Sequence, residues 1–327
     1  MATLKDIAQR AGVTATTVSR VINNRGYISE GTRKKVYAAM EEMHYQPNEL
    51  ARAFSKQYTN TIGLIVPHIS HPFFIKVISN LESSAAEKGF KLLLCNSKEQ
   101  PEKEQDYLDM CISNRVAGIV LCSKYVQTRE FRKMNIPVVN LERGGDDDTI
   151  SVQCDNYQGG KLAAEHLIEC GCKNLLHFGG VAGKDMPADR RADGFSDVCK
   201  KAGIPYRILV SDRLQYGSMH YEDFIRRALQ EFPDVDGIFA SSDLIASQVI
   251  QVGAQMDKHV PEDIQLVGFD DVMISTVTTP QITTIHQPVE EMAELCVEYI
   301  TKSLKNEPVP QKIVLPVRLV QRGTTVL

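Results

Sequence analysis

The chain has 327 residues, of which 43% are hydrophobic and 24% are charged. This is an ordinary globular composition, which excludes a fibrous or disordered chain, and the length suffices for two or three domains with substantial cores. The formal net charge of −4 is unevenly distributed, because residues 1–57 carry nine Lys or Arg against five Asp or Glu (+4), whereas the rest carries 28 basic and 36 acidic residues (−8). A basic front on an acidic body is compatible with a nucleic-acid contact near the N-terminus.

The sequence shows no segment suited to a membrane. The first residues, MATLKDIAQR, lack an apolar signal segment, and every hydrophobic run is far shorter than the roughly 18 residues that cross a bilayer. We therefore expect a cytoplasmic protein without a membrane partner. The cysteines lack the CxxC spacing of a zinc site, which predicts reduced core residues; they are Cys95, Cys111, Cys122, Cys154, Cys170, Cys172, Cys199 and Cys296.

The N-terminal 45 residues have the pattern of three short helices. Thr3 can cap the first, LKDIAQRA, and Gly12 breaks it. Thr14 can cap the second, ATTVSRVIN, because its hydroxyl can accept hydrogen bonds from the free backbone N–H groups of the first turn. Ser29 begins a third and longer helix, which Pro47 ends. Its apolar residues recur at helical spacing: Val36, Tyr37, Met40 and Met43.

The segment NELARAFSKQYTN, residues 48–60, separates these helices from the rest of the chain. Its first eight residues are compatible with one short helix that Asn48 could cap. A helix this short is marginal in isolation, since about 12–15 residues are usually needed in water. We therefore expect a headpiece at residues 1–47, a hinge helix and linker at 48–60 that a partner must order, and a body at 61–327.

From Thr61 onward, short apolar runs alternate with amphipathic helical stretches such as residues 74–88 and 156–170. Strands that are apolar throughout and separated by helix-length connections indicate parallel sheets covered on both faces. About nine or ten strands are expected, which is enough for two sheets and two lobes of an α/β body. The runs are TIGLIVP, FKLLLCN, AGIVLCS, IPVVNL, ISVQCD, NLLHFGG, RILVSD, GIFASSD and IQLVGFDD.

The first two helices and the Gly-containing turn between them form the pattern of a helix-turn-helix. Small residues at the start of the second helix would let it enter a major groove, and Arg20 has the planar fork that suits the N7 and O6 acceptors of guanine. Thr17, Ser19 and Asn23 could instead hold phosphates. Apolar side chains are expected to pack the two helices together: Ile7, Ala8, Val13, Val18 and Val21.

The stretch LKDIAQRAGVTATTVSRVINNRGYISEGTRKKVYAAMEEMHYQPNELARAFS resembles the DNA-binding headpiece and hinge of the lactose/galactose repressor (LacI/GalR) family. The resemblance covers essentially the full length, because LPVRLVQRGTT near the C-terminus is similar to the usual ending of that family. It implies a headpiece, a hinge helix and a two-lobed body like that of periplasmic binding proteins. It also implies a homodimer, with a tetramer left open, whose second helix reads a half-site of double-stranded operator DNA.

The resemblance assigns roles to single positions in the headpiece and hinge. Ala15, Thr16 and Arg20 match the base-reading residues of the family, and Ala15 with Thr16 would set the preferred sequence. Ala51 and Phe54 fall on the hinge face that the family inserts into the minor groove. A Leu usually stands where this chain has Phe54, so Phe54 either forms a bulkier wedge between base steps or packs against its dimer mate. Residues at the helix starts complete the predicted DNA contacts: Thr3, Thr14 and Asn48.

In two-lobed α/β bodies, ligands lie in the crevice outside the carboxyl ends of the strands. After TIGLIVP come Phe73 and Phe74, at positions where the family and the sugar-binding proteins that it resembles stack aromatic rings on a ligand. Ring faces suit the apolar C–H face of a sugar. Two adjacent aromatic residues at a helix start are otherwise core residues, and we expect one of the pair to face the ligand.

Charged residues follow two further strands. Glu142 and Arg143 lie beyond IPVVNL and could bind vicinal hydroxyls through charge-assisted hydrogen bonds, or form a surface ion pair. In PADRRADGF, Arg191 matches the ligand-binding arginine of the family, whereas Arg190 fits a solvated helix face better. These arginines leave open whether the effector is a sugar or a sugar phosphate.

The remaining effector candidates follow strands of the second half. Ser242 stands where the family often has Asn, and Asp243 is expected to cap the following helix. By position, Asp270 is the hydroxyl-binding carboxylate of the family. Asp155, after ISVQC, and Gln287, after TTIH, complete the set. Together these residues describe a polar, hydroxyl-recognising pocket with aromatic walls.

Other chemistries find no support in the sequence. GGVAGKD has a phosphate-loop spacing one residue too short, and Asp185 stands where a Ser or Thr would bind magnesium. His68 and His71 have no obvious Cys or carboxylate partner for a metal, and the acidic run 146–148 is expected to be a solvated loop. No nucleophile–base pair is evident. We expect no enzyme activity, no metal and no cofactor.

The leading hypothesis is a transcriptional repressor of carbohydrate-utilisation genes that responds to a sugar or sugar phosphate. A family regulator controlled by a protein partner, of the carbon-catabolite type, remains an alternative. A stand-alone sugar carrier is disfavoured because a DNA-binding headpiece is attached.

Overall fold

The computed structural model describes residues 2–22, 26–45, 58–123, 136–143, 149–181 and 186–327. The chain forms two compact units, Met1–Thr59 and Asn60–Leu327, which we call the N-terminal and C-terminal units. None of the described helices has the length and apolar character that crossing a bilayer requires. All eight cysteines are free thiols and seven are buried, as the sequence predicted.

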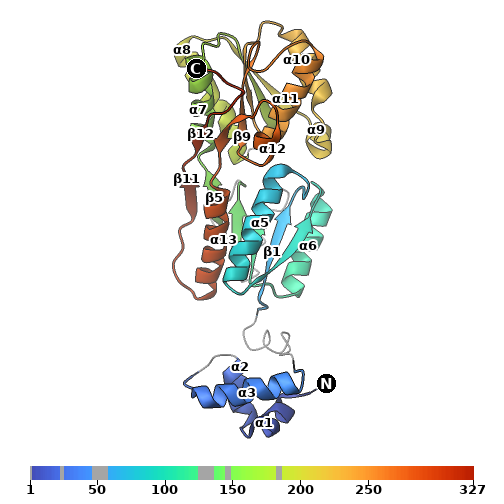
Figure 1. Cartoon of the computed structure of the whole chain (residues 1–327), viewed down its shortest axis with the longest axis vertical. Coiled ribbons are helices and arrows are strands. Elements are labelled where there is room, and N and C mark those ends of the chain that lie inside the picture. The colour runs from blue at the N-terminus through green and yellow to red at the C-terminus, as the bar shows by residue number, and fades with distance from the viewer. Residues whose placement is uncertain (1, 23–25, 46–57, 124–135, 144–148, 182–185) are drawn as a thin grey trace. The chain divides into compact units, whose positions relative to one another are not determined.

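The N-terminal unit contains helices α1 (Leu4–Ala11), α2 (Ala15–Ile22) and α3 (Glu30–Glu42) around a small apolar core (Figure 1). The predicted packing of the first two helices is confirmed, since Ile7, Ala8, Val18 and Val21 are buried and Val13 packs against them. The predicted third helix is present, although one of its apolar residues, Tyr37, is 50% exposed. Val36 and Ala39, three residues apart, supply the buried face of α3. Tyr37 follows Val36 directly, so its side chain is turned by about 100° away from Val36 around the helix axis.

The predicted helix caps are present. The Thr3 hydroxyl accepts from the backbone N–H of Asp6, and the Asp6 carboxylate accepts from that of Thr3 at 2.8 Å. Gly12 ends α1 with φ +67°, a left-handed conformation that glycine adopts without steric cost. Thr14 accepts from Thr17 N at 3.1 Å, and Ser29 caps α3. These local bonds fix the turn between α1 and α2.

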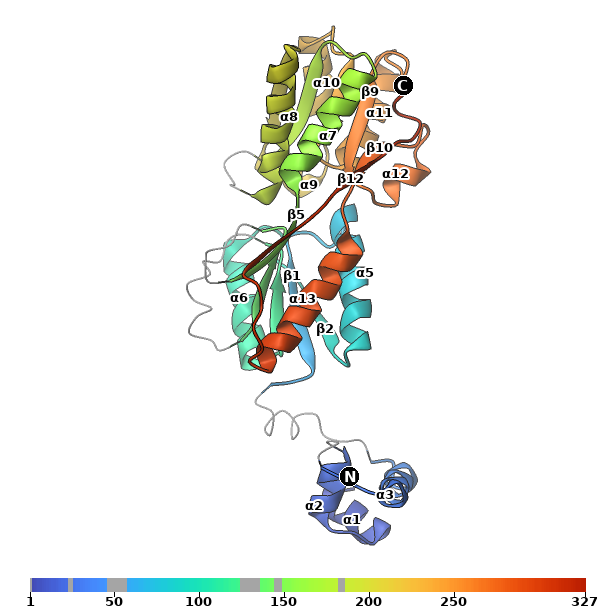
Figure 2. The same cartoon turned by 90° about the vertical axis from the view of Figure 1, so that its left-hand side faces the viewer.

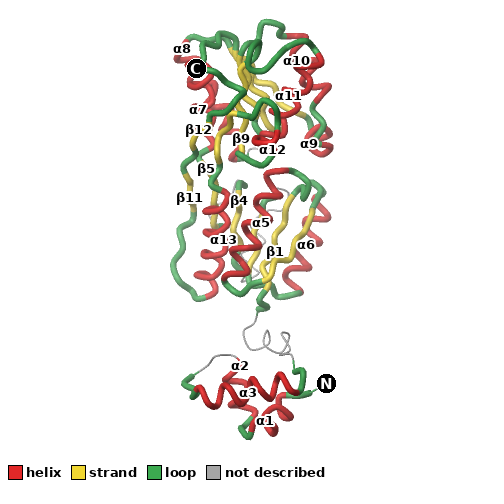
Figure 3. The backbone as a smooth tube through the Cα atoms, in the orientation of Figure 1, coloured by secondary structure: helices red, strands yellow, loops and turns green. Residues whose placement is uncertain are grey.

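The C-terminal unit contains two six-stranded sheets, each the centre of one lobe (Figure 3). The first lobe has the strand order β11-β5-β4-β3-β1-β2, and all its strand pairs are parallel. The bounds are β1 (Thr61–Val66), β2 (Lys91–Asn96), β3 (Gly118–Leu121), β4 (Val138–Leu141), β5 (Ile150–Cys154) and β11 (Lys312–Leu315).

The second lobe has the order β12-β10-β9-β8-β6-β7, in which only the edge strand β12 is antiparallel to its neighbour. The bounds are β6 (Leu175–Val181), β7 (Tyr206–Ser211), β8 (Gly237–Ala240), β9 (Gln265–Asp270), β10 (Thr283–His286) and β12 (Arg318–Val320). The predicted α/β class with two parallel sheets is therefore confirmed. All nine strands predicted from apolar runs are present, while β10, β11 and β12 were missed. Strands β11 and β12 are short edge strands with few buried residues, and β10 is a buried strand of four residues, of which two are Thr.

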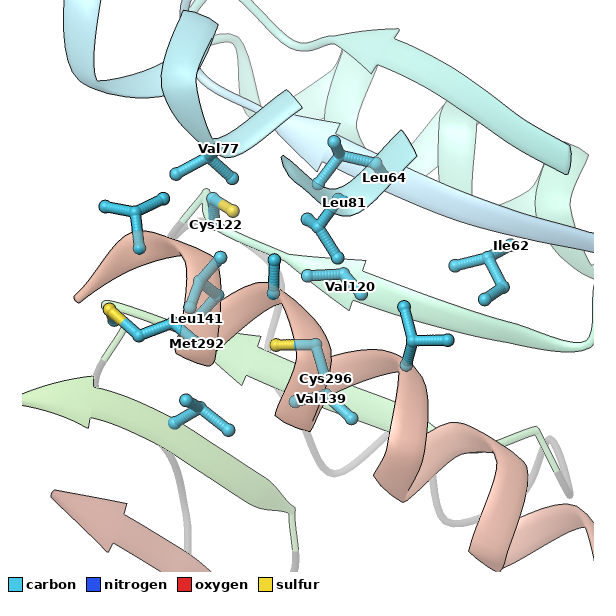
Figure 4. Close-up of a cluster of buried hydrophobic side chains, with 14 of the residues drawn as sticks. Ile62, Leu64, Val77, Leu81, Val120, Cys122, Val139, Leu141, Met292 and Cys296 are labelled. Atoms are coloured by element: carbon cyan, nitrogen blue, oxygen red, sulfur yellow. The ribbon is translucent and has the colours of Figure 1, made fainter. Parts of the chain in front are cut away.

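Helices cover both faces of the first sheet. Helices α5 (Pro72–Glu87) and α13 (Val289–Leu304) pack on one face, where Val77, Leu81, Met292 and Cys296 meet the strands (Figure 4). Helix α6 (Pro101–Ser113) covers the other face through Leu108 and Cys111. The strands are apolar throughout because both faces are buried.

The second sheet is covered in the same way. Helices α10 (Glu222–Glu231) and α11 (Asp243–Gln255) pack on one face. Helices α7 (Asn156–Glu169) and α8 (Arg190–Ala202) pack on the other. Three short helices complete the lobe: η2 (Pro187–Asp189), α9 (Arg213–Ser218) and α12 (Ile274–Val277).

The chain passes between the lobes three times: after β5, after β10, and between β11 and β12 (Figure 2). Helix α13, which follows β10 of the second sheet, therefore packs on the first sheet. Each lobe is completed by segments far apart in the sequence, so neither lobe corresponds to one continuous half of the chain.

Helices α7 and α8 approach each other closely through two glycines. A Cβ at Gly160 would lie 1.9 Å from the carbonyl oxygen of Arg191, and one at Gly194 would lie 2.0 Å from that of Tyr157. No side chain fits at these distances, so the two glycines fix the separation of the helices. This separation positions the start of α8, which carries Arg191.

We predict that Gly160→Ala destabilises the C-terminal unit by at least about 1–3 kcal/mol, because the added methyl group forces a backbone shift. Urea unfolding measures the change. The matched control is Gly217→Ala in α9, where a Cβ meets no atom within 4 Å, so a small gain in stability is expected there. Equal unfolding midpoints for the two variants would contradict the prediction.

Candidate functional site

The outer face of α2 is the candidate nucleic-acid interface of the N-terminal unit. Val18 and Val21 point into the core, whereas Thr16 and Arg20 are exposed. Because these two residues are four apart, they lie on one face of the helix. Ala15, Thr17 and Ser19 are half-buried beside that face. The helix thus presents small residues at its start and a guanidinium one turn later.

The other predicted DNA-binding residues either cap helices or lie outside the residues that the structure describes. Thr3 and Thr14 act in the structure as helix caps. Asn23, Asn48, Ala51 and Phe54 lie outside the described residues. Arg10 forms an exposed ion pair between α1 and α3, in which its Nη2 donates to Glu42 Oε1 at 2.6 Å.

The C-terminal unit contains a cavity of about 140 Å³ at the carboxyl ends of both sheets. Residues at or just beyond the carboxyl ends of β1, β3, β4, β6, β7, β8, β9 and β10 contribute to its walls. Seven of the nine predicted effector residues line this cavity: Phe73, Phe74, Glu142, Arg191, Ser242, Asp270 and Gln287. The rule that ligands lie beyond the carboxyl ends of strands led to these positions.

Aromatic rings form one wall of the cavity at the start of α5. Both Phe73 and Phe74 line it, with ring centroids 5.2 Å apart and planes inclined by 69°, although the sequence predicted that only one of the pair would face a ligand. His71 caps the helix, because its Nδ1 accepts from Phe73 N at 3.3 Å. Burial, aided by the neighbouring charges of His68 and Arg191, lowers the pKa of His71 to about 4. The imidazole is therefore neutral at pH 7, and its other nitrogen carries the hydrogen.

Arg191 stands at the centre of a buried polar network. Its Nε donates to Asn156 Oδ1 at 2.7 Å and its Nη1 to the carbonyl oxygen of Ser241 at 2.6 Å. The guanidinium carbon lies 3.5 Å from the ring centroid of Phe269, a cation–π contact that strengthens when desolvated. Asn156 in turn donates to Glu142 Oε2 at 3.0 Å. The network therefore joins Glu142 of the first lobe to the second lobe.

Asp270 and Gln287 form the opposite polar wall. Gln287 Nε2 donates to Asp270 Oδ1 at 2.6 Å. Burial raises the pKa of Asp270 to about 7, although the charge of Arg191 and the Gln287 hydrogen bond oppose the rise. The Oε1 atom of Gln287 is buried and has no hydrogen-bond partner among the described residues. Both side chains can thus accept hydrogen bonds from hydroxyl groups.

The sequence assigned the wrong residue as the cap of α11. Ser242 is the N-cap, since its Oγ accepts from Ile245 N at 3.2 Å. Asp243 is instead fully buried, where its carboxylate accepts from Thr284 Oγ1 and from Val272 N. Ser242 also lines the cavity, so its hydroxyl hydrogen can point toward a ligand.

Two predicted effector residues do not line the cavity. Arg143 is buried and donates from Nη1 to Asn140 Oδ1 at 3.0 Å, which turns the guanidinium back to β4. Asp155 caps α7 by accepting from Gln158 N at 2.9 Å. A side chain just beyond a strand can serve the local backbone as well as a ligand, and sequence position alone does not distinguish these roles.

The structure adds cavity residues that sequence reasoning missed. Ser123, directly after AGIVLC, is buried, and its hydroxyl has no partner among the described residues. The same end-of-strand rule could have identified it. His71, which the sequence analysis considered only as a metal ligand, is buried at the cavity. Tyr216 and Tyr221 come from α9 and the residue before α10, where no sequence pattern marked them.

No group of three or more His, Cys, Asp or Glu that could hold a metal ion occurs in the described part of the chain. The cavity offers instead aromatic rings, one guanidinium, carboxylates, hydroxyls and an amide. Such a set recognises a hydroxyl-rich ligand through paired hydrogen bonds and ring stacking.

Comparison with known proteins gives two matching family models. Residues 3–48 match the bacterial regulatory proteins of the lacI family, and residues 164–325 match the periplasmic binding protein-like domain. The chain is 33% identical over 326 residues to the ribose operon repressor of Halalkalibacterium halodurans, which covers 99% of this chain and 97% of that protein. It is 35% identical over 329 residues to the sucrose operon repressor of Pediococcus pentosaceus, with 98% of each covered.

A similar solved structure is that of a periplasmic binding protein/LacI transcriptional regulator from Alkaliphilus metalliredigens complexed with D-xylulofuranose. The TM-score is 0.74 at 32% identity, over 82% of this chain and 100% of that chain.

The raised pKa of Asp270 predicts a pH-dependent stability. A carboxyl group whose pKa is about 7 in the folded state and near its ordinary value of 3.8 in the unfolded state binds its proton more tightly when folded. The free energy of unfolding therefore falls as pH rises from about 4 to 7 and is constant above. Asp270→Asn removes this titration, so its stability relative to wild type should rise by up to about 1.4 kcal/mol per pH unit in that window.

Urea unfolding of both proteins between pH 4.5 and 8 measures this difference. The pKa of Asp243 is also raised, by burial first and then by the charge of Asp270. Loss of that charge lowers the pKa of Asp243 in the variant, which changes the difference in stability in the same direction. A difference in free energy of unfolding between the two proteins that stays constant across this pH range would contradict a raised pKa of Asp270.

Proposed function

The chain belongs to the LacI family of bacterial regulatory proteins, and we propose that it is a repressor of carbohydrate-utilisation genes controlled by a sugar or sugar-phosphate effector. Family members are transcriptional repressors rather than enzymes. The observation that carries the proposal is that one chain combines a helix-turn-helix with a buried cavity of aromatic, carboxylate, guanidinium and amide groups. Binding to operator DNA would place its action in the cytoplasm.

On the DNA side, we propose that α2 enters the major groove. Ala15, Thr16 and Arg20 would read bases, because the latter two share the exposed face of the helix. Thr17, Ser19 and Asn23 would hold phosphates, as would the helix starts at Thr3, Thr14 and Asn48. Residues 48–60 would form the hinge, with Ala51 and Phe54 at the minor groove.

On the effector side, Phe73 and Phe74 would stack on the ring of the ligand. Asp270, Gln287 and Arg191 would bind its hydroxyls, together with Ser242 and Glu142. The ribose and sucrose operon repressors and the regulator complexed with D-xylulofuranose, to which this chain is similar, support a sugar as the effector class. No observation on the described residues favours a protein partner over a sugar.

We propose a homodimer that uses the exposed face of α5 and α12. Ile75 on α5 is 52% exposed, and Met273 and Val277 at α12 are 78% and 66% exposed. The two elements are neighbours, because Lys76 Nζ donates to the carbonyl oxygen of Asp271 at 2.9 Å (Figure 1). Large apolar side chains exposed together on both lobes indicate an interface.

The same face would connect ligand and DNA binding. The Lys76–Asp271 hydrogen bond joins α5 of the first lobe to the second lobe beside Asp270. A ligand that changes the lobe arrangement would therefore shift the dimer interface and the paired hinges. Because a hinge helix of this length needs a partner to order it, a small change in hinge separation is sufficient to weaken operator binding. Ligand and operator affinities are then reciprocally coupled.

We predict that Arg20→Ala weakens binding to the preferred operator by roughly 1–3 kcal/mol, because a bidentate guanine contact is lost. The operator is first selected from a random duplex pool with the wild-type protein, and affinity is measured by fluorescence anisotropy. Arg20→Lys keeps the charge without the planar fork, and should restore nonspecific binding but not sequence preference. Wild-type affinity of Arg20→Ala would remove this residue from base reading.

We predict that Arg191→Ala abolishes the thermal stabilisation by sugars, whereas Arg190→Ala retains it. Arg191 is 6% exposed at the cavity, whereas Arg190 pairs with Asp193 on the surface. A sugar at 100 times its dissociation constant should add about 2.7 kcal/mol of stability to wild type and to Arg190→Ala. Loss of the response in both variants, or in neither, would show that the cavity is not the effector site. A wild-type protein that responds to no sugar or sugar phosphate would favour control by a protein partner.

A further inference from the structure

The sequence leaves open whether the effector carries a phosphate, because three arginines lie near the expected site. We infer that the cavity takes an uncharged, unphosphorylated sugar. This inference rests on the proposed function and narrows its effector class. Four observations carry it: the charges that line the cavity, the partners of Arg191, the occupied helix ends, and the buried groups that need hydrogen bonds.

The charge of the cavity wall is predominantly negative. Among the described residues, Arg191 is the one Arg or Lys that lines it, whereas four carboxyl groups do: Glu99, Glu142, Asp189 and Asp270. A phosphomonoester carries a charge of about −1.5 to −2 at neutral pH. Placing it beside these carboxyl groups opposes like charges in a partly desolvated site, where their repulsion is stronger than in water.

The other described cations near the site are directed elsewhere. Arg143, which does not line the cavity, donates to Asn140, and Arg190 pairs with Asp193 on the surface, Nε to Oδ2, at 3.0 Å. Lys76 donates to the carbonyl oxygen of Asp271. His71 does line the cavity, but its lowered pKa keeps the imidazole neutral. A cluster of cations that could neutralise a phosphate is therefore not formed by these residues.

Arg191 itself is only partly available. Its Nε and Nη1 atoms are bound by Asn156 and Ser241, and one face of the guanidinium is covered by Phe269. The remaining donor edge can hold one or two hydroxyl oxygens. Through Asn156 the guanidinium is also linked to Glu142, which compensates part of its charge within the protein.

At the helix N-termini beside the cavity, side chains already occupy one backbone amide each. Backbone N–H groups at such ends are common phosphate sites. Here, Phe73 N at the start of α5 donates to His71 Nδ1, and Ile245 N at the start of α11 donates to Ser242 Oγ. Met186 N, before η2, donates to Asp189 Oδ2 at 2.7 Å. These three side-chain caps stand where phosphate oxygens would otherwise bind.

Two buried groups at the cavity lack hydrogen-bond partners, and hydroxyl groups of a ligand can satisfy both. Gln287 Oε1 and Ser123 Oγ are 1% and 2% exposed as residues and have no hydrogen-bond partner among the described residues. Gln287 Oε1 can only accept, as can the ionised carboxylate of Asp270. A sugar hydroxyl supplies the hydrogen that each needs, whereas a phosphate dianion placed at these two atoms has none to donate. Satisfying such buried acceptors strongly favours a ligand that carries the donor.

Isothermal titration calorimetry of the full-length protein against matched pairs tests the inference. The pairs are D-ribose with ribose 5-phosphate, D-xylulose with xylulose 5-phosphate, D-fructose with fructose 6-phosphate, and D-glucose with glucose 6-phosphate. We expect at least one free sugar to bind, its phosphate to bind at least about 100-fold more weakly, and the sugar affinity to change little with salt, since no ligand charge is screened. Tighter binding of a phosphorylated member would overturn the inference and leave the proposed function intact.

If none of these compounds binds, the proposed function fails together with the inference.

A double variant and a control variant test separately whether the carboxylates of the cavity wall disfavour the phosphate. The double variant Glu99→Gln/Asp189→Asn removes two carboxylates from the wall and should narrow the ratio between sugar and sugar-phosphate affinity by about tenfold. The control Glu102→Gln neutralises an exposed carboxylate on α6 that does not line the cavity, and should leave the ratio unchanged. Equal ratios in the double variant and the control would show that these wall charges do not select the ligand.

Discussion

The burial of the Arg191 guanidinium against Phe269 is the interaction on which the cavity depends. A guanidinium so deeply buried is tolerated only when its donors are paired, and Asn156 and Ser241 provide the partners. The same network reaches Glu142 at the end of β4, so it spans from one sheet to the other. The close approach of α7 and α8 at Gly160 and Gly194 places Arg191 there. The close packing of α7 and α8 therefore determines where the guanidinium lies and which hydrogen bonds it can form at the cavity.

The path of the chain explains how two lobes can share one site. Three crossings place the ends of β5, β10 and β11 at the boundary between the lobes, and Gln287 lies within one of them. A rotation of one lobe against the other would change the backbone at these crossings and the hydrogen bonds beside them, including that of Lys76 with Asp271. Gln287 therefore belongs both to the cavity wall and to a connection that such a rotation would strain.

Much of the fold can be predicted from local sequence patterns. Whether a single polar side chain faces the cavity or forms hydrogen bonds within the protein cannot be predicted in this way. Thr3, Gly12 and Thr14 act through bonds within a few residues, so their roles could be read from the sequence. Residues beyond strands were placed near the cavity by topology. Whether such a residue faces a ligand depends on distant partners, as Arg143 on Asn140 and Asp243 on Thr284 show. The cavity tyrosines come from α9 and the start of α10, and no periodic pattern predicts where these connections fold back.

A ligand can shift a conformational equilibrium only by the difference between its free energies of interaction with the two arrangements. The described cavity contains a source of that difference. Asp270 is buried with a pKa near 7, and Gln287 Oε1 lacks a donor. Hydroxyl groups that donate to both atoms would favour the ionised form of Asp270 and satisfy the amide in the same step. Asp270 ends β9 and Gln287 directly follows the neighbouring strand β10, so both acceptors belong to the second lobe. Ser123 and Glu142 contribute to the cavity from the first lobe. A ligand whose hydroxyl groups bond to both sets at once gains these interactions only in a lobe arrangement that brings the two sets to it, and it can thereby select an arrangement of the whole C-terminal unit.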